Sequence, residues 1–322
     1  MNAKNPIVVA AWLIATLPNV AAAQAYPHKP IRFVVPFGVG GPGDTIGRMI
    51  GRQLSNSLGQ PVVIDNRSGA TTIIGTELTA KSQPDGYTML LISTTHAVNP
   101  SLFPKLPYDP IKDFAPVTLI TSTPFMLCVH PSVAANSVPE LIAIARNKLG
   151  SLNYGSSGAG SSIHLTTELL KSAAQIQMTH VPYKGSGPAF IDLIGGQIQL
   201  LFSSTVSSMP HVKSGKVRGL AITSLKRATA LPGIPTLAES YPGFESSSWF
   251  GILVPARTPK PVIDRLLADT RSAIKSPDVN HALVSQGAEP GGQSSAEFAT
   301  YFQSEINKWA GVIKSAGIRL EQ

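Results

Sequence analysis

The amino-acid sequence predicts an α/β protein of two domains, in which mostly parallel sheets are covered by helices. Short apolar runs alternate along the chain with stretches whose apolar residues are spaced three and four apart, and this is the pattern of strands followed by helices. Hydrophobic residues make up 43% of the chain and charged residues 14%, which is typical of packed cores rather than disorder. A length of 322 residues is enough for two such cores.

The first 25 residues are predicted to be a secretory signal peptide. One basic residue precedes an apolar run over residues 7–17, and Ala23 and Ala25 each complete an A-x-A cleavage site. Tyr26 begins sequence of a different character, which favours cleavage after Ala25. The alternative, a single membrane anchor, is disfavoured because the apolar run is short, and no later run is long enough to span a bilayer. We therefore expect a soluble mature protein in the periplasm.

The first block of the mature chain predicts four strands and one helix. The helix follows a glycine-rich loop, its apolar residues recur at spacings of three and four from Ile46 to Leu58, and Gly59 with Pro61 ends it. The strands are short apolar runs bounded by turn residues. They are expected over residues 31–35, 62–64, 87–92 and 117–120.

A second block begins near Phe125 and repeats the order of strand, loop and helix. Its first helix should begin at Ser137, because Ser137 and Glu140 match a capping box. Strands are expected over residues 125–129, 152–154, 198–202 and 217–222, with a glycine-serine loop over 155–162, a helix over 164–174, a loop over 184–188 and a short helix around Phe190.

The chain is then expected to cross back to the first domain. Residues 247–255 form one extended apolar run, and helices follow over 261–275, over 277–286 and from a second capping box at Ser294 and Glu297. We therefore predict a first domain of residues 26–124 plus 250–322, and a second domain of residues 125–249.

The glycine-rich loop of residues 36–45 is the main indication of function. It lies between a buried strand and a helix, and so exposes backbone N–H groups at the positive end of a helix dipole, which suits an anion. A second glycine-serine loop, over residues 155–161, precedes the helix of the second block. Because loops at the carboxyl ends of parallel strands face one crevice, the two helix ends can hold two carboxylates of one small ligand.

A dinucleotide-binding protein is one alternative. Gly38, Gly40 and Gly43 match G-x-G-x-x-G, and Asp65 stands where a ribose-binding acid is expected. However, Asp44 at the helix start would repel a pyrophosphate, a proline in the loop removes one N–H group, and an exported protein meets little nicotinamide cofactor. We expect Asp44 to act mainly as a helix cap. The NAD-binding alternative ranks last.

A secreted serine hydrolase is the alternative from a different class of function. Ser157 or Ser161 would be the nucleophile and His164 the base, although the loop lacks the last glycine of G-x-S-x-G. His164 is more simply explained as a polar residue that caps or lines the loop. No histidine spacing or acidic cluster is typical of a metal site, so neither a metal nor a cofactor is expected.

The charge of the chain limits the classes of binding partner, and its cysteine content limits the disulfides that it can form. The net charge is +8, but Lys and Arg are scattered without a basic run, which favours attraction of small anions over binding of nucleic acid. Cys128 is the single cysteine, so no disulfide can form within the chain.

Several motifs together resemble one known family. They are Tyr26-Pro27, Lys29-Pro30-Ile31, Pro36-Phe37 with Gly40-Gly41 and Asp44, Asp65-Asn66-Arg67 with Gly69-Ala70, Pro84-Asp85-Gly86-Tyr87-Thr88, Tyr154-Gly155-Ser156 with Gly158, Gly160 and His164, Val181-Pro182-Tyr183-Lys184-Gly185, and Trp249-Phe250-Gly251. Over essentially the whole mature chain the sequence resembles the Bug-type extracytoplasmic solute receptors of the tripartite tricarboxylate transporter group.

The resemblance implies a type II periplasmic-binding-protein fold, with two domains joined by two crossover segments and closing on a small carboxylate. It further implies a non-enzymatic monomer that serves a membrane permease or a sensor kinase. The ligand residues carried over are Phe37, Gly38, Gly40, Gly41, Asp44 and Thr45 in the first domain, Ser156, Ser157, Gly160, Ser161 and His164 in the second, and also Asn66, Arg67, Ser93, Thr94, Tyr183 and Lys184.

The sequence departs from the family pattern at two positions. Val39 replaces a proline of many relatives, a change that the neighbouring glycines should tolerate. Gln199 replaces an acid, which removes a negative charge near the second domain's side of the cleft and disfavours a ligand with an ammonium group.

Overall fold

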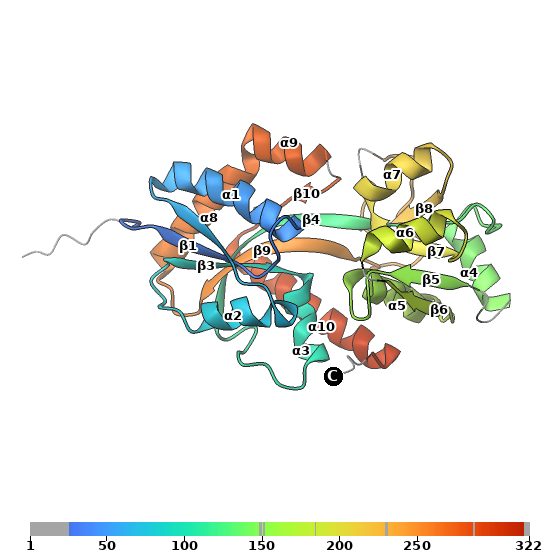
Figure 1. Ribbon diagram of the computed structural model, residues 1–322, viewed down its shortest axis with the longest axis horizontal. Helices are drawn as coiled ribbons and strands as arrows, with labels where there is room; N and C mark the ends of the chain where they lie inside the picture. Colours follow the sequence, from blue (N-terminus) through green and yellow to red (C-terminus); the bar gives the residue numbers. More distant parts are fainter. Residues whose placement is uncertain are drawn as a thin grey trace, which may run out of the picture.

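The computed structural model describes residues 26–147, 150, 152–183, 185–228, 231–285 and 287–318. The predicted signal peptide and the predicted ligand residue Lys184 lie outside the described residues. Within those ranges, the strands form one mixed sheet in the order β2-β1-β3-β9-β4-β7-β5-β6, and helices cover its faces (Figure 1).

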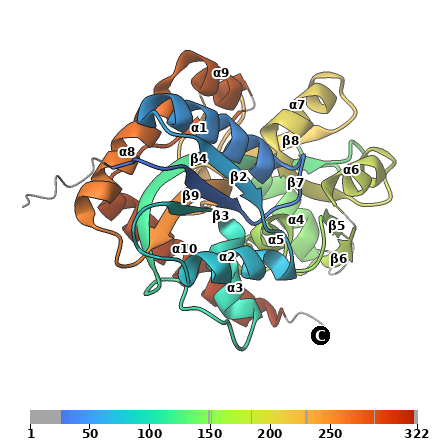
Figure 2. The ribbon, with the colours of Figure 1, turned by 60° about the vertical axis from the view of Figure 1, so that its left-hand side comes forward.

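Three parallel strands form one end of the sheet. They are β1 (Ile31–Val35), β2 (Val62–Asn66) and β3 (Thr88–Ser93), with Ile31 beside Val62 and Arg32 beside Thr88. Helices α1 (Pro42–Leu58), α8 (Lys260–Lys275) and α9 (Pro277–Ser285) lie on one face, and α2 (Ile73–Ala80), α3 (Thr94–Leu102) and α10 (Ser295–Ala316) lie on the other (Figure 2).

A second set of parallel strands forms the other end. It contains β5 (Asn153–Ser156), β6 (Thr179–Pro182) and β7 (Leu200–Ser204), in which Tyr154 lies beside both His180 and Leu200. The helices of this end are α4 (Val138–Asn147), α5 (Ser162–Ala174), α6 (Ser186–Ile194) and α7 (Thr205–Lys213). Strand β8 (Arg218–Ile222) pairs with the same part of β4 as β7 does, but on its opposite edge.

Two long strands connect these ends through the middle of the molecule (Figure 1). They are β4 (Phe114–Val129) and β9 (Ser247–Pro255), and they run antiparallel to each other and to their other partners. The sequence-based prediction of separate strands over 117–120 and 125–129 was wrong, because β4 continues through Pro116 and Pro124. The register shifts beside Pro116, and Pro124 lies where β4 changes partner from β9 to β7, positions at which a strand tolerates proline.

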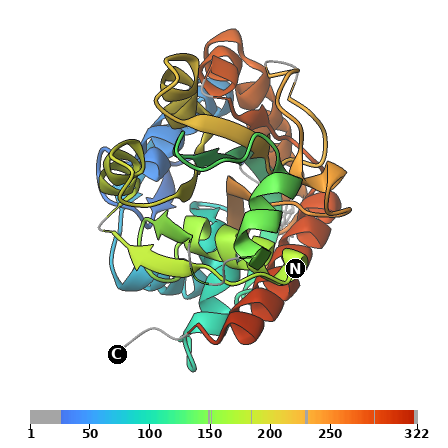
Figure 3. The same ribbon diagram turned by 90° about the vertical axis from the view of Figure 1, so that its right-hand side faces the viewer.

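Buried side chains form three clusters. Two of them, centred on β1 with α1 and on α3 with α10, define what we call the first lobe, and the third, centred on β4, β7 and α5, defines the second lobe. Leu165 of α5 nevertheless belongs to the α3–α10 cluster, so α10 packs against both lobes, and Figure 3 shows this helix in red beside the second lobe. The domain boundaries named above, at residues 124 and 249, stay a prediction.

Helix ends follow the local sequence signals. α1 begins with Pro42 in its first turn and ends at Gly59, whose φ of 66° is left-handed, and α10 begins with the predicted capping box of Ser294 and Glu297. The predicted box of Ser137 and Glu140 is formed only in part. The Ser137 hydroxyl accepts from the Glu140 amide at 3.4 Å, but the backbone amide that donates to the Glu140 carboxylate, at 2.8 Å, belongs to Asn136. In the described part of the chain, no helix combines the length and apolar character required to cross a membrane.

Candidate functional site

The carboxyl ends of the parallel strands in both lobes carry the residues that the sequence analysis selected. β1, β2 and β3 lead into the segments of Phe37, Asn66 and Thr94, and β5 and β6 lead into those of Ser157 and Tyr183. In parallel sheets such ends form the edge at which ligands bind. The question is which of these segments meet across the gap between the lobes.

A cavity of about 240 Å³ lies between the lobes. None of the described residues that line it has a charged side chain. The walls are formed by Thr71, Ser93, Thr94, Thr95, Val98, Asn99 and Leu102 of the first lobe, by Ala159, Gly160, Ser161 and Ser162 of the second, and by Ser248 and Phe250 of β9. The cavity therefore brings together four of the predicted residues, namely Ser93, Thr94, Gly160 and Ser161.

The start of α3 forms the first-lobe wall of the cavity. The Ser93 hydroxyl caps this helix by accepting a hydrogen bond from the Thr95 amide at 3.2 Å. The Thr94 hydroxyl donates to the Ser247 carbonyl at 3.2 Å and accepts from the Trp249 amide at 3.3 Å. These bonds fix the helix start to β9, so its partial positive charge has a set position at the cavity.

The start of α5 forms the opposite wall. The Ser161 hydroxyl accepts from the His164 amide at 3.3 Å and is the N-cap of the helix. Gly160, just before it, has a φ of 73°, a left-handed conformation that favours glycine. Two helix N-termini lined by hydroxyl groups thus meet at one cavity whose described wall residues carry no charge, an arrangement that stabilises a small anion.

The glycine-rich loop before α1 satisfies much of its own hydrogen bonding. The Gly40 amide donates to the Asp44 carboxylate at 2.9 Å, and the Gly41 amide donates to the Gly38 carbonyl at 3.3 Å. The amide of Thr45 donates to the Gly41 carbonyl at 3.0 Å in the first turn of α1. An amide that a pyrophosphate would need is therefore already occupied by the carboxylate, which argues against the NAD-binding alternative.

Asp44 is the centre of this network. Arg48 donates to its carboxylate at 3.0 Å, and the Asn66 amide group donates to it at 2.9 Å and to the Phe37 carbonyl at 3.2 Å. The bond from Arg48, together with those from Gly40 and Asn66, lowers the pKa of the Asp44 carboxyl to about 2. Asp44 and Asn66 thus connect the ends of β1 and β2.

The other predicted first-lobe residues lie outside the cavity wall. Phe37 packs edge-to-face on Phe250, a residue of the cavity wall, with ring centroids 5.9 Å apart. Arg67 is half exposed and donates to Asp65 at 2.9 Å. Whether these side chains contact a ligand stays a prediction.

A strained segment follows β2 and contributes Thr71 to the cavity. Ala70, Thr71 and Thr72 have φ values of 44°, 53° and 73°, and Gly69 before them has 131°. Left-handed backbone is unfavourable for residues other than glycine, and most of all for β-branched residues such as the two threonines. Three left-handed residues in succession are found only where surrounding contacts hold them. The Asn99 side chain provides one such contact, because it donates to the Thr71 carbonyl at 2.8 Å.

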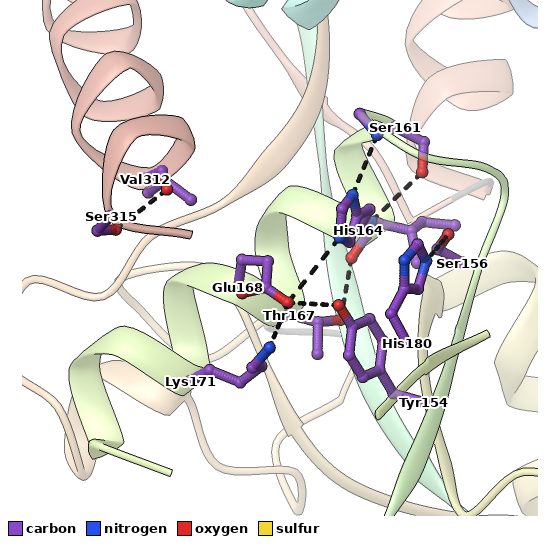
Figure 4. Close-up of polar contacts among 12 residues, drawn as sticks. Tyr154, Ser156, Ser161, His164, Thr167, Glu168, Lys171, His180, Val312 and Ser315 are labelled. Carbon is purple, nitrogen blue, oxygen red and sulfur yellow. Dashed lines mark hydrogen bonds and ion pairs between the residues drawn. The ribbon is translucent and has the colours of Figure 1, made fainter. Parts of the chain in front are cut away.

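Of the predicted second-lobe residues, Gly160 and Ser161 line the cavity, whereas Ser156, His164 and Tyr183 form hydrogen bonds within the lobe. Ser156 is fully buried, and its hydroxyl lies 2.6 Å from Nε2 of His180. His164 is 7% exposed, and its Nδ1 accepts from the Gly160 amide at 3.0 Å (Figure 4). The Tyr183 hydroxyl donates to Asp192 at 2.7 Å.

This geometry does not form the catalytic pair of a serine hydrolase. In the described residues no hydrogen bond joins the His164 ring to Ser157 or Ser161, and Ser161 instead caps α5. The serine that does contact a histidine, Ser156, has no exposure to a substrate. No group of three or more metal-ligating side chains occurs among the described residues either.

Sequence reasoning missed several residues of the site, namely Thr71, Thr95, Asn99, Ser162, Ser248, Phe250 and His180. Thr95 and Asn99 lie on α3, a helix that the sequence did not predict. Phe250 belongs to a quoted family motif, Trp249-Phe250-Gly251, and that motif was the available signal.

The chain is similar to a known protein family and to named proteins over most of its length. A family model described as the tripartite tricarboxylate transporter family receptor matches residues 46–318. Protein BugT of Bordetella pertussis is 39% identical over 328 residues, which cover 100% of this chain and 100% of BugT.

Two solved structures with ligands are also similar. R. palustris Rpa4515 with adipate is 38% identical, with a TM-score of 0.75 over 92% of this chain and 100% of that protein. MatC (Rpa3494) from Rhodopseudomonas palustris with bound malate is 32% identical, with a TM-score of 0.71 over 89% of this chain and 100% of that protein. Solved structures with this fold include periplasmic binding proteins, which confirms the predicted fold class. The similar proteins are receptors and binding proteins rather than enzymes.

Proposed function

Because this chain belongs to the tripartite tricarboxylate transporter receptor family, we propose that it is a periplasmic solute-binding protein that captures a small organic dicarboxylate between its two lobes. The observation that carries the proposal is the cavity between the starts of α3 and α5, whose described wall residues offer hydroxyl groups and carry no charge. Two helix ends provide two separate places for negative charge. The adipate and malate bound by two relatives are ligands of this kind.

No lysine or arginine is found among the described residues of the cavity wall, and Lys184 lies outside the described residues. A carboxylate held by helix ends and hydroxyl groups needs several convergent neutral donors instead of one ion pair. Nor does any described residue of the wall have an acidic side chain that would pair with an ammonium group. We therefore propose that the ligand is a dicarboxylate or related organic acid without an ammonium group. The expectation that Gln199 lies on the cleft side was wrong, because Gln199 precedes the amino end of β7 and its side-chain oxygen accepts from the Asn153 amide, at the amino end of β5, at 2.9 Å.

The remaining parts of the proposal concern location and partners. We propose that residues 1–25 direct export, that the chain acts in the periplasm as a monomer, and that it delivers its ligand to a tripartite-type membrane permease or a sensor kinase. We also propose that the domains are residues 26–124 plus 250–322 and residues 125–249, which is supported by the change of strand partner beside Pro124.

A ligand screen on stripped protein tests this function. Purified chain, unfolded and refolded to remove bound ligand, is melted in the presence of acetate, malate, adipate and citrate, with the diamide of adipic acid as the uncharged control. A dicarboxylate at about 100 times its dissociation constant should add about 2.7 kcal/mol to the free energy of unfolding. If no carboxylate raises the melting temperature, the proposed function is wrong.

A matched pair of variants locates the ligand. Ser162→Phe introduces a large side chain at the cavity wall, whereas Ser172→Phe places the same side chain on an exposed position of the same helix. Calorimetric titration should show at least about tenfold weaker binding for the first variant and unchanged binding for the second. Equal affinity in both variants would place the ligand elsewhere.

A further inference from the structure

Two histidine rings lie beneath the loop that forms the second-lobe wall of the cavity (Figure 4). His164 of α5 and His180 of β6 are stacked face to face, with ring centroids 3.9 Å apart and an interplanar angle of 7°. Tyr154 of β5 continues the stack, 4.9 Å from His180. Neither histidine is among the residues that line the cavity, so their contacts with the loop are what they can contribute to the site.

His164 holds the part of the loop nearest the helix start. Its Nδ1 accepts a hydrogen bond from the Gly160 amide at 3.0 Å. A ring nitrogen that accepts from an amide carries no proton, so the proton of the neutral ring is on Nε2, which faces Glu168 at 3.9 Å. Gly160 lines the cavity directly, and its peptide is therefore oriented by this one nitrogen.

His180 holds the beginning of the loop through Ser156. The Ser156 hydroxyl donates to the Gly158 carbonyl at 3.0 Å and accepts from the Gly158 amide at 3.1 Å. With its single proton on that carbonyl, the Ser156 hydroxyl can meet Nε2 of His180, 2.6 Å away, only as an acceptor, and we therefore assign the imidazole N–H as the donor of this contact. The Gly158 carbonyl also accepts from the Ser161 amide at 3.2 Å.

Both supported peptides belong to glycines in the positive-φ region. Gly158 has a φ of 126° and Gly160 has 73°, and neither has a side chain of its own to hold it in place. The loop therefore has the freedom of two glycines, and its shape is set from below by two imidazoles. That shape decides whether the N-terminus of α5 faces the cavity.

We propose that His164 and His180 are positioning residues that hold the loop of residues 157–161 in the shape that receives an anionic ligand. The expected effect of the two histidines on ligand binding depends on the function proposed above, whereas their effect on the geometry of the loop does not. His164 acts through an unprotonated Nδ1 and His180 through a protonated Nε2, so the two rings have opposite hydrogen-bonding roles.

The surroundings keep both rings neutral near neutral pH. The charged and titratable groups around His164 are Glu168 and Lys171 on its own helix, Tyr154 on β5 and His180 on β6. Glu168 accepts from the Tyr154 hydroxyl and from Lys171, the latter at 2.6 Å. On α10, which also packs against α5, Glu305 and Lys308 pair with each other.

Proton uptake should affect the two rings differently. Burial, followed by the proximity of His180, lowers the pKa of His164 to about 4, and burial also lowers the pKa of His180. A proton on Nδ1 of His164 would face the Gly160 amide donor and break that bond. A proton on His180 would leave its donation to Ser156 in place. Acid should therefore release the loop at Gly160 first.

Crossed amide substitutions test the two roles. The terminal amide of asparagine reaches the position of Nδ1 in histidine, and that of glutamine reaches the position of Nε2. His164→Asn and His180→Gln should therefore keep the loop contacts, whereas His164→Gln and His180→Asn should lose them. Each pair has the same chemistry, so each member is the control for the other.

The first measurement is made on ligand-free protein, by hydrogen exchange of the Gly158 and Gly160 amides. His164→Gln should speed exchange at Gly160 by about tenfold relative to His164→Asn, and the His180 pair should show the corresponding difference at Gly158. Equal exchange within both pairs would overturn the proposal. If a variant does not fold, nitrogen NMR of the wild-type ring decides, because a protonated Nδ1 in His164 at neutral pH is also incompatible with the proposal.

The second measurement is calorimetric titration with adipate as the probe. His164→Gln should bind about tenfold more weakly than His164→Asn. Because adipate itself takes up protons as the pH is lowered toward about 4, both wild type and His164→Asn should lose affinity there, but the wild-type loss should be steeper because His164 is protonated as well. Equal affinities with an equal acid response would count against the proposal. If the wild-type chain binds no carboxylate, the proposed function fails, while the exchange measurement still decides the roles of the histidines.

Discussion

Replacing Glu305 with alanine should destabilise the whole chain, because one carboxylate oxygen accepts hydrogen bonds from two buried indoles. Glu305 is 1% exposed on α10, and its Oε2 lies 2.8 Å from Nε1 of Trp249 and 3.0 Å from Nε1 of Trp309. Trp249 belongs to β9, which crosses between the lobes, and Lys308 extends the network to the Glu245 carbonyl at 3.2 Å. The carboxylate thus joins the crossing strand to the C-terminal helix.

The size of the effect follows from what the substitution leaves behind. Each buried N–H group without an acceptor costs about 1–3 kcal/mol, so two indoles together cost about 2–6 kcal/mol. The midpoint, about 4 kcal/mol, corresponds to a fall in melting temperature of about 6 °C for a chain of this length. Glu305→Gln keeps a carbonyl oxygen for the indoles and loses only the charge, so its cost should be about half as large.

The assay benefits from the position of the tryptophans. Of the 3 tryptophans in the sequence, Trp12 lies in the predicted signal peptide, so Trp249 and Trp309 are expected to be the fluorophores of the mature chain. Urea unfolding followed by fluorescence measures stability, and the two indole N–H resonances report the bonds directly. Gln303→Ala, on an exposed position of α10, is the control. A Glu305→Ala variant within about 0.5 kcal/mol of wild type, with unchanged indole resonances, would refute the reasoning.

Three further predictions concern stability and are measured by urea unfolding. Gly251→Ala should cost about 1–3 kcal/mol, because the added carbon would lie 2.2 Å from Cζ of the buried Phe298, and an unchanged midpoint would contradict this. Thr72→Gly should raise stability by about 0.5–1 kcal/mol, since it relieves left-handed strain and removes a buried hydroxyl without a partner, and a loss of stability would show that Thr72 packing outweighs strain. Asp44 has a folded pKa of about 2, below its ordinary 3.8, so its contribution should be present above about pH 4 and lost as pH falls through about 2. Asp44→Asn should flatten that acid dependence, and an unchanged slope would show that other carboxylates cause it.

Most helices and strands that have a clear local sequence pattern were predicted from that pattern. The strand of β1, the helix α1 with its glycine end, and the capping box of α10 were expected and are present. Helix α3 was missed because Thr94, Thr95 and Pro100 make its sequence a poor helix former. It forms because one side packs against α10 and β9, a contact between segments far apart in the chain.

The candidate site was predictable in part, for the same physical reason. Ser93, Thr94, Gly160 and Ser161 follow strands and precede helices, so their position at a sheet edge could be expected from local sequence. The role of His180 could not, because its partners, His164 and Ser156, come from a different helix and a different strand. The hydrogen bond from the Gly40 amide to the Asp44 carboxylate could not be predicted from the glycine motif alone either.

The pairing of β4 with β9 has a mechanical consequence. Because both strands run unbroken between the lobes and are hydrogen-bonded to each other, the lobes are joined by a ribbon instead of by loose chain. Any closing movement must bend or twist these two paired strands, and such a distortion costs energy, so the angle between the lobes has a preferred value. We therefore expect the unliganded lobes to vibrate about one separation, and a ligand to shift that angle against an elastic restoring force.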